Sequence, residues 1–596
     1  MQAIEFYENN IEELDLKIKK LLAKKSVFGL LRFGNVLLII FVFYYLWHIN
    51  IILAIAIAVL LSIVFIQLIY KDLTNKAAIK HLQHVQKINE NEILAVEGIN
   101  SQFENGFKFT PNNHFYANDM DIFGSSSLYQ FLNRTTSEHS AKKMADWLLA
   151  PAKPEIILQR QAAVKELSTK MPWVQNLQAI GKENSIKEST MQKINNWLKE
   201  PNLFLQFKHW QWLRWAIPGI ILSITALFVF DFVSKSVWYL FLLIALIIAF
   251  QINKIIAPLH NKLSDIVNDL AILKDSIASI ENENYTSPLL HQLKTNLQSK
   301  NNFASNKIKA LKKILDKLDM RYNIVISIQL NIFLMWNLQQ VLDLENWKKN
   351  NSENLNIWFD TLAEFEVLNS FAVIHFNNPD WCFPQLKDNH FCIFAEELGH
   401  PLIHKKNRVN NYIDIKNSGK ILLVTGSNMA GKSTYLRSIG INTILAMAGA
   451  PVCAKTFVVA HVQLISSMRI TDNLEENTST FYAELKKLKT IIEKINAGEK
   501  IFILLDEILR GTNSLDRHTG SEALIKQLIK QKAVAILATH DVALAKLEDV
   551  YPQNIVNYHF DAQTKGEELY FDYKLKNGVC TNMNASLLMK KIGLEL

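Results

Sequence analysis

The chain has 596 residues, of which 49% are apolar and 20% are charged, so it is long enough to form several domains with separate cores. With 64 Lys and Arg against 56 Asp and Glu, the formal net charge is only +8, which identifies neither nucleic acid nor anionic lipid as a partner. The four cysteines form no CxxC pair and have no metal-ligand spacing. A disulfide framework is therefore not indicated, and we expect reduced thiols in the cytoplasm.

The N-terminal half contains two pairs of long apolar runs. Residues 1–26 have the pattern of a charged amphipathic helix, and apolar runs follow at about 30–47 and 51–70. A second pair lies at about 215–232 and 237–252, and Trp and Tyr residues lie near the ends of the runs, as in aromatic belts. A membrane-spanning helix needs roughly 20 predominantly apolar residues. The second run reaches this length, whereas the first and fourth are somewhat shorter.

We therefore predict four transmembrane helices in two hairpins, at 27–71 and 211–253. The alternative is a buried helical hairpin in a soluble protein. Lys and Arg residues flank the hairpins at their open ends, whereas the two short connections contain a single Lys, Lys235. The positive-inside rule then places both termini and all large segments in the cytoplasm, with the chain integral to the cytoplasmic (inner) membrane.

Outside the apolar hairpins, the predicted secondary structure changes at about residue 389. Segments 72–210 and 254–388 have apolar residues at helical spacing and predict a mostly helical core in two parts, the second including a lever. The run 324–336 is apolar but short and interrupted by Asn and Gln, so we predict a buried core helix there rather than a fifth span. From 389 to 596, strands alternate with helices, which predicts a mostly parallel sheet covered on both faces. The predicted fold class is multidomain α plus α/β.

One loop of the last domain has the form of a phosphate-binding loop. Gly-x4-Gly-Lys-Ser at 426–433 follows the apolar strand "KILLVTG" and opens the helix "STYLRSIGINTILA", the context that such a loop requires. Glycines let backbone N–H groups face the phosphates, and the helix N-terminus adds a positive dipole. We predict that ATP binds here, with Lys432 bridging the β- and γ-phosphates and Ser433 ligating Mg²⁺. The predicted nucleotide-binding residues are Gly426, Ser427, Asn428, Met429, Ala430, Gly431, Lys432, Ser433 and Thr434.

Two further strands end in residues that suit ATP hydrolysis. "KIFILLDE" places Asp506 at the carboxyl end of a buried strand, where it would hold Mg²⁺ through water. Glu507 follows, and a carboxylate beside the γ-phosphate can accept a proton from the attacking water. "AVAILATH" ends in His540, and contact of this His with the γ-phosphate is favoured only because the other two elements exist. We assign Glu507 and His540 as catalytic; a solvated acidic pair and a structural His are the alternatives.

These motifs resemble the ATPase domain of the MutS family of DNA mismatch-repair proteins. The resemblance rests on "TGSNMAGKSTYLR", "LLDEILRGTNSLD" and "ATH", with "TSTFYAELKKLKTI" similar to the family's signature segment. It implies a homodimeric ABC-type ATPase that uses ATP and Mg²⁺ at composite sites. Ser479 of one subunit would face the phosphate loop of the other, and Asp516 would lie near the subunit contact. Upstream, "VNNYIDI" resembles the segment that helps form the family's adenine pocket, which implies nucleotide contacts by Val409 and Asn411.

The sequence also departs from the family's pattern. Only the residues before Phe123 precede the part that resembles the family's helical core, and a predicted membrane hairpin occupies many of them. We therefore expect no mismatch-reading domain, and we interpret "EFYENN" (5–10), which resembles the family's mismatch-wedging motif, as coincidence. The second hairpin falls at the lever end, where the family continues towards a DNA clamp, and Asn477 replaces a signature glycine. The chain ends at Leu596 without the family's dimerisation helices, so we expect self-association through the ATPase faces and the membrane helices.

The predicted function is a membrane-anchored MutS-like ATPase, with DNA binding or DNA repair near the membrane as its coupled role. DNA is thus a candidate partner beside the lipid bilayer and a second copy of the chain, and Lys and Arg of the helical core would give salt-sensitive, sequence-independent contact. The alternatives are an ABC-like membrane transporter or remodeller and an ATP-switched membrane scaffold with no DNA role. Against the transporter, the signature lacks a glycine-rich string, and the spans carry almost no polar residues that could line a path.

Overall fold

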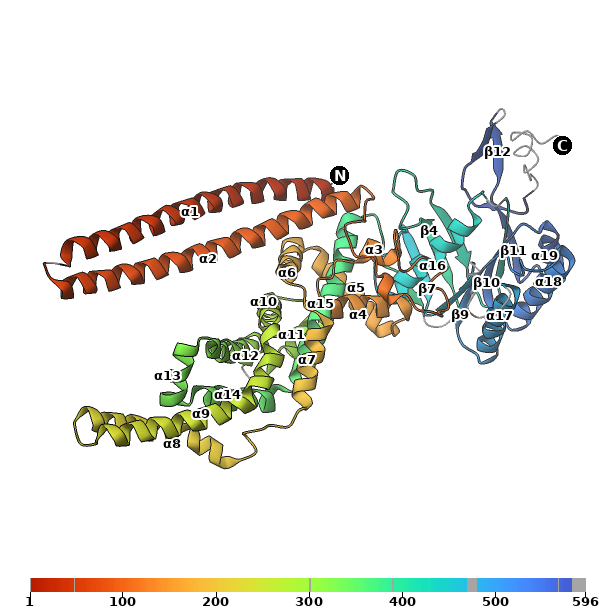
Figure 1. The fold of residues 1–596 in the computed structure, drawn as a ribbon. Coiled ribbons are helices and arrows are strands. Elements are labelled where there is room, and N and C mark those ends of the chain that lie inside the picture. Colours follow the sequence, from red (N-terminus) through yellow and green to blue (C-terminus); the bar gives the residue numbers. More distant parts are fainter. Residues whose placement is uncertain are drawn as a thin grey trace.

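The computed structural model shows two long hairpins, a helical core whose sequence the second hairpin interrupts, and a C-terminal α/β domain (Figure 1). The hairpins project from one side of the molecule, and the α/β domain lies at the opposite side. The described residues are 2–47, 49–299, 302–387, 391–427, 429–468, 480–565 and 568–580.

The helices of the first hairpin are much longer than the apolar runs predicted within them. α1 (Gln2–Leu46) and α2 (Ile51–Val96) lie antiparallel over their length (Figure 1). The predicted amphipathic helix 1–26 is thus continuous with the first apolar run, because a change from charged to apolar sequence is no helix-stop signal. Near this change, the buried Asp72 carboxylate lies 3.1 Å from the Arg32 guanidinium, so a charge pair joins the two helices there.

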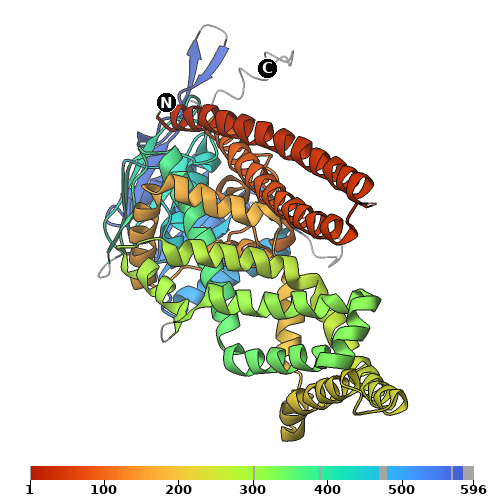
Figure 2. The ribbon, with the colours of Figure 1, turned by 90° about the vertical axis from the view of Figure 1, so that its left-hand side faces the viewer.

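The second hairpin is shorter and is formed by α8 (Lys208–Val229) and α9 (Lys235–Leu263). Near its turn, the Trp238 ring stacks on Phe228 with centroids 4.6 Å apart, and its indole N–H donates to Thr225 Oγ1 at 3.1 Å. The turns of both hairpins point to the same side of the molecule (Figures 1 and 2).

The helices of both hairpins expose their apolar side chains. By length and composition, four helices of the described chain are able to cross a membrane, and they are the four of these hairpins, the last one counted through to Asn282. The bent helix pair Ile324–Leu334 and Trp336–Asn351 would be a fifth if the two form one span. None of the most apolar 18-residue window of α1 is buried, and the buried share of the other three windows is 11% to 22%. This is the reverse of the burial that apolar helices have in the core of a water-soluble protein.

The predicted buried helix at 324–336 is wrong. α13 (Ile324–Leu334) buries only Asn331, and Ile324 and Val325 are 72% and 68% exposed. The next helix, α14 (Trp336–Asn351), departs from it by 78° at Met335, whose φ is +47°. This bend turns α13 out of the core and against α8 and α9, which an apolar sequence alone does not reveal.

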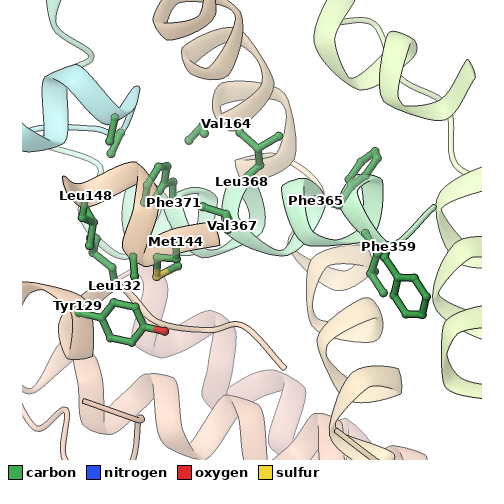
Figure 3. Packing of buried hydrophobic residues seen from close by; sticks show 14 of the residues in the cluster. Tyr129, Leu132, Met144, Leu148, Val164, Phe359, Phe365, Val367, Leu368 and Phe371 are labelled. Carbon is green, nitrogen blue, oxygen red and sulfur yellow. The ribbon is translucent and has the colours of Figure 1, made fainter. Parts of the chain in front are cut away.

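The helical core is organised around α15 (Asn354–Asn377), against which α4 (Glu138–Leu149) and α5 (Pro154–Ser168) pack. Phe371 of α15 and Leu148 of α4 belong to one buried apolar cluster (Figure 3). The remaining core helices are α3 (Leu128–Leu132), α6 (Met171–Glu183), α7 (Glu188–Lys199), α10 (Val267–Asn282), α11 (Pro288–Asn296) and α12 (Ala304–Leu318).

A buried polar network fixes the base of the first hairpin to this core. The Arg134 guanidinium donates to both carboxylate oxygens of Glu92 on α2, at 2.8 and 3.0 Å. Asn377 of α15 donates to the same carboxylate at 2.9 Å, and the Tyr7 hydroxyl of α1 donates to Asn377 Oδ1 at 2.7 Å. Tyr7 is completely buried. The Phe-Tyr-Glu string of "EFYENN" thus lies in the base of this hairpin and has a structural role there.

The α/β domain is built on a six-stranded sheet with the order β14-β11-β6-β10-β9-β8. All of its pairs are parallel except β14 with β11, so the sheet is mostly parallel, as predicted. Its strands are β6 (Ile421–Thr425), β8 (Gln463–Ser467), β9 (Ile501–Asp506), β10 (Val534–Thr539), β11 (Ile555–His559) and β14 (Lys576–Asn577).

Helices cover both faces of this sheet. Alternate residues of its strands enter two separate apolar clusters, because successive side chains of a strand point to opposite faces. One cluster includes α16 (Lys432–Ala448), and the other includes α17 (Thr480–Asn496) and α18 (Ser514–Lys530). A mixed sheet, β3-β7-β4-β5, adjoins it. Its strands are β3 (Gln385–Lys387), β4 (Ile393–Leu398), β5 (Asn411–Ile415) and β7 (Thr456–Ala460); the short elements are β1 (Gln298–Ser299), β2 (Asn302–Phe303), β12 (Ala562–Lys565), β13 (Glu568–Phe571) and α19 (Leu547–Val550).

Candidate nucleotide site

The predicted phosphate-binding loop lies between β6 and α16, and its two glycines are required by the backbone. β6 is buried along its whole length, so its carboxyl end is fixed at the edge of the sheet. Gly426 has φ +138° and Gly431 has φ +105°, values that L side chains rarely adopt. A Cβ at Gly426 would also lie 2.5 Å from the Phe560 carbonyl oxygen. The loop therefore turns sharply from the strand into the N-terminus of α16.

Lys432, the first residue of α16, folds back over this loop. Its Nζ donates to the carbonyl oxygens of Gly426 at 2.6 Å and Ser427 at 3.0 Å, and the side chain is almost completely buried. Burial lowers the pKa of Lys432, and the nearby Glu507 and Asp506 carboxylates oppose that shift. A buried ammonium beside a glycine loop at a helix N-terminus is suited to bind phosphate oxygens.

Asp506 lies one strand away from Thr425 at the same edge of the sheet, because β10 separates β9 from β6. Burial raises the pKa of Asp506, and a hydrogen bond with the Ser433 hydroxyl lowers it. Among the residues that the structure describes, the buried atoms Asp506 Oδ1 and Ser427 Oγ have no hydrogen-bond partner. Buried oxygen atoms without partners, next to a second hydroxyl, are suited to Mg²⁺, which binds oxygen and keeps several waters.

The described part of the chain contains no group of three or more His, Cys, Asp or Glu residues able to hold a metal ion. A Mg²⁺ ion commonly takes one or two ligands from the protein and the rest from substrate phosphates and waters.

The two predicted catalytic residues lie together. Glu507 Oε1 is 3.7 Å from His540 Nδ1, too far for a hydrogen bond, and the Glu507 backbone N–H donates to Ala538 O at 2.9 Å. Arg510 approaches Glu507 Oε2 to 3.2 Å and also donates to the Glu507 carbonyl oxygen at 3.0 Å. The sequence prediction missed Arg510, although its position three residues after Glu507 in "DEILRG" was a usable signal.

Glu484 is a second residue that the sequence prediction missed. It lies on α17, its side chain is buried, and its Oε1 accepts the Leu509 backbone N–H at 2.5 Å. Burial raises the pKa of Glu484, while hydrogen bonds from the backbone of Leu509 and Arg510 lower it. Glu507 and Leu509 have φ values of +50° and +59°, so Glu484 holds a segment whose backbone conformation is strained. It thereby connects the signature segment to the proposed catalytic base.

Val409 and Asn411, predicted near the adenine, line an open cavity of about 650 Å³. Asn411 Nδ2 donates to Tyr573 O at 3.0 Å, and its Oδ1 accepts the Leu575 N–H at 2.8 Å. The Tyr573 ring in turn lies against Gly431, since a Cβ there would be 3.1 Å from it. The cavity and the phosphate loop are therefore neighbours.

The structure describes most, but not all, of the remaining predicted site residues. Asp516 lies in the first turn of α18, exposed, where its backbone N–H is capped by Asn513 Oδ1 at 2.9 Å. Ser479 and Asn428 lie outside the described residues. Met429 is exposed, Ala430 is buried, and Thr434 is exposed at the start of α16.

A sheet strand that leads through a glycine loop into a helix, with a carboxylate at the end of a nearby parallel strand, defines the class of α/β domains that bind nucleotide phosphates. Residues 422–591 match the family model for MutS domain V. This part of the chain is therefore similar to domain V of MutS proteins.

Individual relatives agree with this assignment. The chain is 31% identical to MutS protein homolog 4 from Homo sapiens over 239 residues, 38% of this chain and 25% of that protein. It is 32% identical to DNA mismatch repair protein MutS from Chlorobium phaeovibrioides over 228 residues, 37% of this chain and 26% of that protein. It is 30% identical to DNA mismatch repair protein MSH3 from Candida albicans over 272 residues, 42% and 26% of the two chains. The chain thus spans about a quarter of the length of the curated relatives it matches.

Proposed function

We propose that the chain is a membrane-anchored ATP hydrolase of the MutS family, an ABC-type P-loop ATPase that acts as a homodimer. The observation that carries this proposal is the arrangement of Lys432 over a glycine loop, beside the unpaired Asp506 Oδ1 at the end of a neighbouring strand. Phosphate oxygens would replace the two carbonyl groups as partners of the Lys432 ammonium. Mg²⁺, held by Ser433 and Asp506, would neutralise charge on the transferred phosphoryl group.

Glu507 accepts the proton of the attacking water in this proposal, and His540 contacts the γ-phosphate. Both side chains border the space beyond the phosphate loop, since Glu507 follows β9 and His540 follows β10. Arg510 lies against the Glu507 carboxylate and neutralises it until ATP binds. Rearrangement of this pair on ATP binding would release Glu507 to act as a base.

Homodimerisation is supported by the exposed start of α18. Leu515, beside the predicted contact residue Asp516, is 74% exposed, and a large apolar side chain at that exposure suits an interface. The relatives' printed names, DNA mismatch repair protein and MutS protein homolog, say nothing of assembly. The dimer is therefore proposed from the composite-site resemblance and from this exposed turn.

Membrane anchoring is supported by the exposure of the hairpins. Apolar windows of mean hydropathy 1.7 to 3.0 are 78% to 100% unburied, and both turns point to one side of the molecule (Figure 1), so one bilayer could receive both hairpins. Lys and Arg residues flank both hairpins at their open ends, whereas the two turns contain only Lys235, so the positive-inside rule favours a cytoplasmic ATPase domain. In inverted and right-side-out vesicles, Lys235→Cys should react with an impermeant thiol reagent only from the face opposite the ATPase domain. Equal reaction from both faces would reject this topology.

The test of hydrolysis is Glu507→Gln, with Glu522→Gln on exposed α18 as its matched control. Glu507→Gln should bind ATP normally, hydrolyse it at least about 100-fold more slowly because the general base is lost, and accumulate as an ATP-bound dimer in light scattering. Glu522→Gln should behave as the wild type. Normal hydrolysis by Glu507→Gln would show that another group is the base.

DNA binding is the coupled role that the relatives favour, because two of them are named as DNA mismatch repair proteins. Detergent-solubilised protein should bind homoduplex, mismatched and branched DNA with an affinity that falls steeply with salt. Absence of binding at low salt, with hydrolysis intact, would instead favour a transporter, a remodeller or a membrane scaffold. Hydrolysis stimulated by lipid or by a solute would distinguish among these.

A further inference from the structure

α13 is an exposed apolar helix that the proposed ATPase site does not use. Its sequence, IVISIQLNIFL, contains no charged residue. Ile326 and Ile328 are each 46% exposed, in addition to the still more exposed Ile324 and Val325 at its N-terminal end. Contiguous apolar surface of this kind on a folded protein marks a site that another apolar medium or molecule covers.

The contacts of α13 place it at the open end of the second hairpin. Asn337, two residues after the bend at Met335, donates to Asn253 Oδ1 of α9 at 3.2 Å. Arg321, three residues before the N-terminal end of α13, donates to the Ala257 carbonyl oxygen of α9 at 3.5 Å. Both contacts fall just past the apolar run 237–252. The segments that flank α13 are thus held near the open end of the hairpin, and α13 itself crosses α8 and α9 instead of running parallel to them (Figure 1).

We propose that α13 lies in the cytoplasmic surface of the same bilayer that the second hairpin spans, with Ile324, Val325 and Ile328 in contact with lipid. This inference rests on the proposed membrane anchoring. If the apolar run of α9 fills the hydrocarbon core, then Asn253 and Ala257 lie at its cytoplasmic boundary, and α13 must lie there too. An interfacial helix buries its apolar face by about 5–10 Å at the boundary of headgroups and acyl chains.

The residues around α13 fit this position. Tyr322, which is 61% exposed, is an amphipathic ring of the kind that concentrates at membrane interfaces. Arg321, at the same end, brings a cation to the level of anionic headgroups. Phe250 of α9, 71% exposed, lies within a turn of Asn253, so exposed apolar surface continues from the span to the level of α13.

A bilayer fits this surface better than a second copy of the chain. α13 and the turns of both hairpins lie on the side of the molecule away from the sheet (Figures 1 and 2), as a single planar medium requires. A protein interface would carry a polar rim with hydrogen-bonding groups, whereas the exposed N-terminal half of α13 is almost uniformly aliphatic. The bilayer would then be attached at three places, the two hairpins and α13.

The experiment measures depth in liposomes of phosphatidylcholine and phosphatidylglycerol. The four native cysteines of the full chain are replaced by alanine, and single cysteines at Val325→Cys, Leu243→Cys and Lys309→Cys carry an environment-sensitive nitrobenzoxadiazole dye. Leu243 is exposed near the middle of the apolar run 237–252 of α9, and Lys309 is exposed on the charged helix α12. Circular dichroism and gel filtration check that each variant is folded. Quenching is compared between lipids spin-labelled near the headgroup and lipids spin-labelled deep in the acyl chain.

We expect the dye at 325 to be quenched at least about twofold more by the shallow label than by the deep one, as for an interfacial helix, and the dye at 243 to show the reverse order. The dye at 309 should show little quenching by either. Quenching at 243 without quenching at 325 would overturn the position of α13 and leave the membrane anchoring intact. Deep quenching at 325 would make α13 part of a span and would also overturn the proposal. Absence of quenching at all three positions would reject the membrane anchoring itself.

Discussion

Replacing Glu484 by Gln should slow ATP hydrolysis without weakening ATP binding. Gln has the same shape, but its acceptor is a neutral amide oxygen. The carboxylate of Glu484 accepts the Leu509 N–H at 2.5 Å in a buried setting. Hydrogen bonds to charged groups contribute about 1.5–3 kcal/mol and those between neutral groups about 0.5–1.5 kcal/mol. The substitution therefore removes about 1–1.5 kcal/mol of support from the loop that carries Glu507.

If that support holds Glu507 in its catalytic position, kcat should fall by about 5- to 15-fold, since 1.36 kcal/mol corresponds to a factor of ten in rate. KM should not change, because Glu484 lies away from the phosphate loop. Glu493→Gln, on the exposed face of the same helix, is the matched control. Steady-state hydrolysis and binding of a fluorescent ATP analogue measure both quantities. An unchanged kcat, or a loss that appears only in KM, would refute a positioning role for Glu484.

Three other changes test the site, the core and the dimer. Burial raises the pKa of Asp506. In the protein without nucleotide, the Asp506 carboxyl group therefore lowers the stability of the fold as the pH rises through the window from the ordinary pKa of Asp to the raised pKa, because the unfolded chain loses the proton first. Asp506→Asn removes this cost, and differential scanning fluorimetry should show a higher Tm above that window, no gain below it, and loss of hydrolysis. Glu92→Ala leaves the buried Arg134 guanidinium without its partner and should lower the free energy of unfolding by about 3–5 kcal/mol in urea titrations. Leu515→Lys should weaken the ATP-bound dimer in analytical ultracentrifugation and leave the monomer's Tm unchanged.

The nucleotide site was predictable in its local parts. Lys432 and Asp506 each follow or end a short apolar strand, and the spacing of a strand, a glycine loop and a helix is a property of adjacent residues. Arg510 was missed although its spacing of three residues from Glu507 was a usable signal. Glu484 was not predictable, because its contact with the loop after β9 depends on how α17 packs on the sheet. Such contacts bring together residues from separate elements, and no periodicity in the sequence records them.

The helices were also predictable only in part. Apolar runs predicted the positions of both hairpins, but not that α1 would continue unbroken from charged into apolar sequence. Gly29 and Gly34 lie within it and do not interrupt it, since an isolated glycine costs a helix only about 1 kcal/mol. α13 was mistaken for a core helix because composition gives the apolarity of a segment and not the medium that covers it. The deciding feature, the left-handed Met335, is a single backbone conformation.

The two hairpins are attached to opposite parts of the helical core, and this constrains how ATP hydrolysis could act on them. The first is fixed rigidly, because the Glu92–Arg134 ion pair is buried and Phe6 packs on Phe376 of α15 with ring centroids 5.1 Å apart. α15 leads directly into the α/β domain, so the first hairpin must follow any movement of that helix. The second is reached through α14 and α9, whose contact includes Asn337 and Asn253. If both turns remain in one bilayer, a movement of the α/β domain has to be absorbed between these two attachments, within the helical core itself.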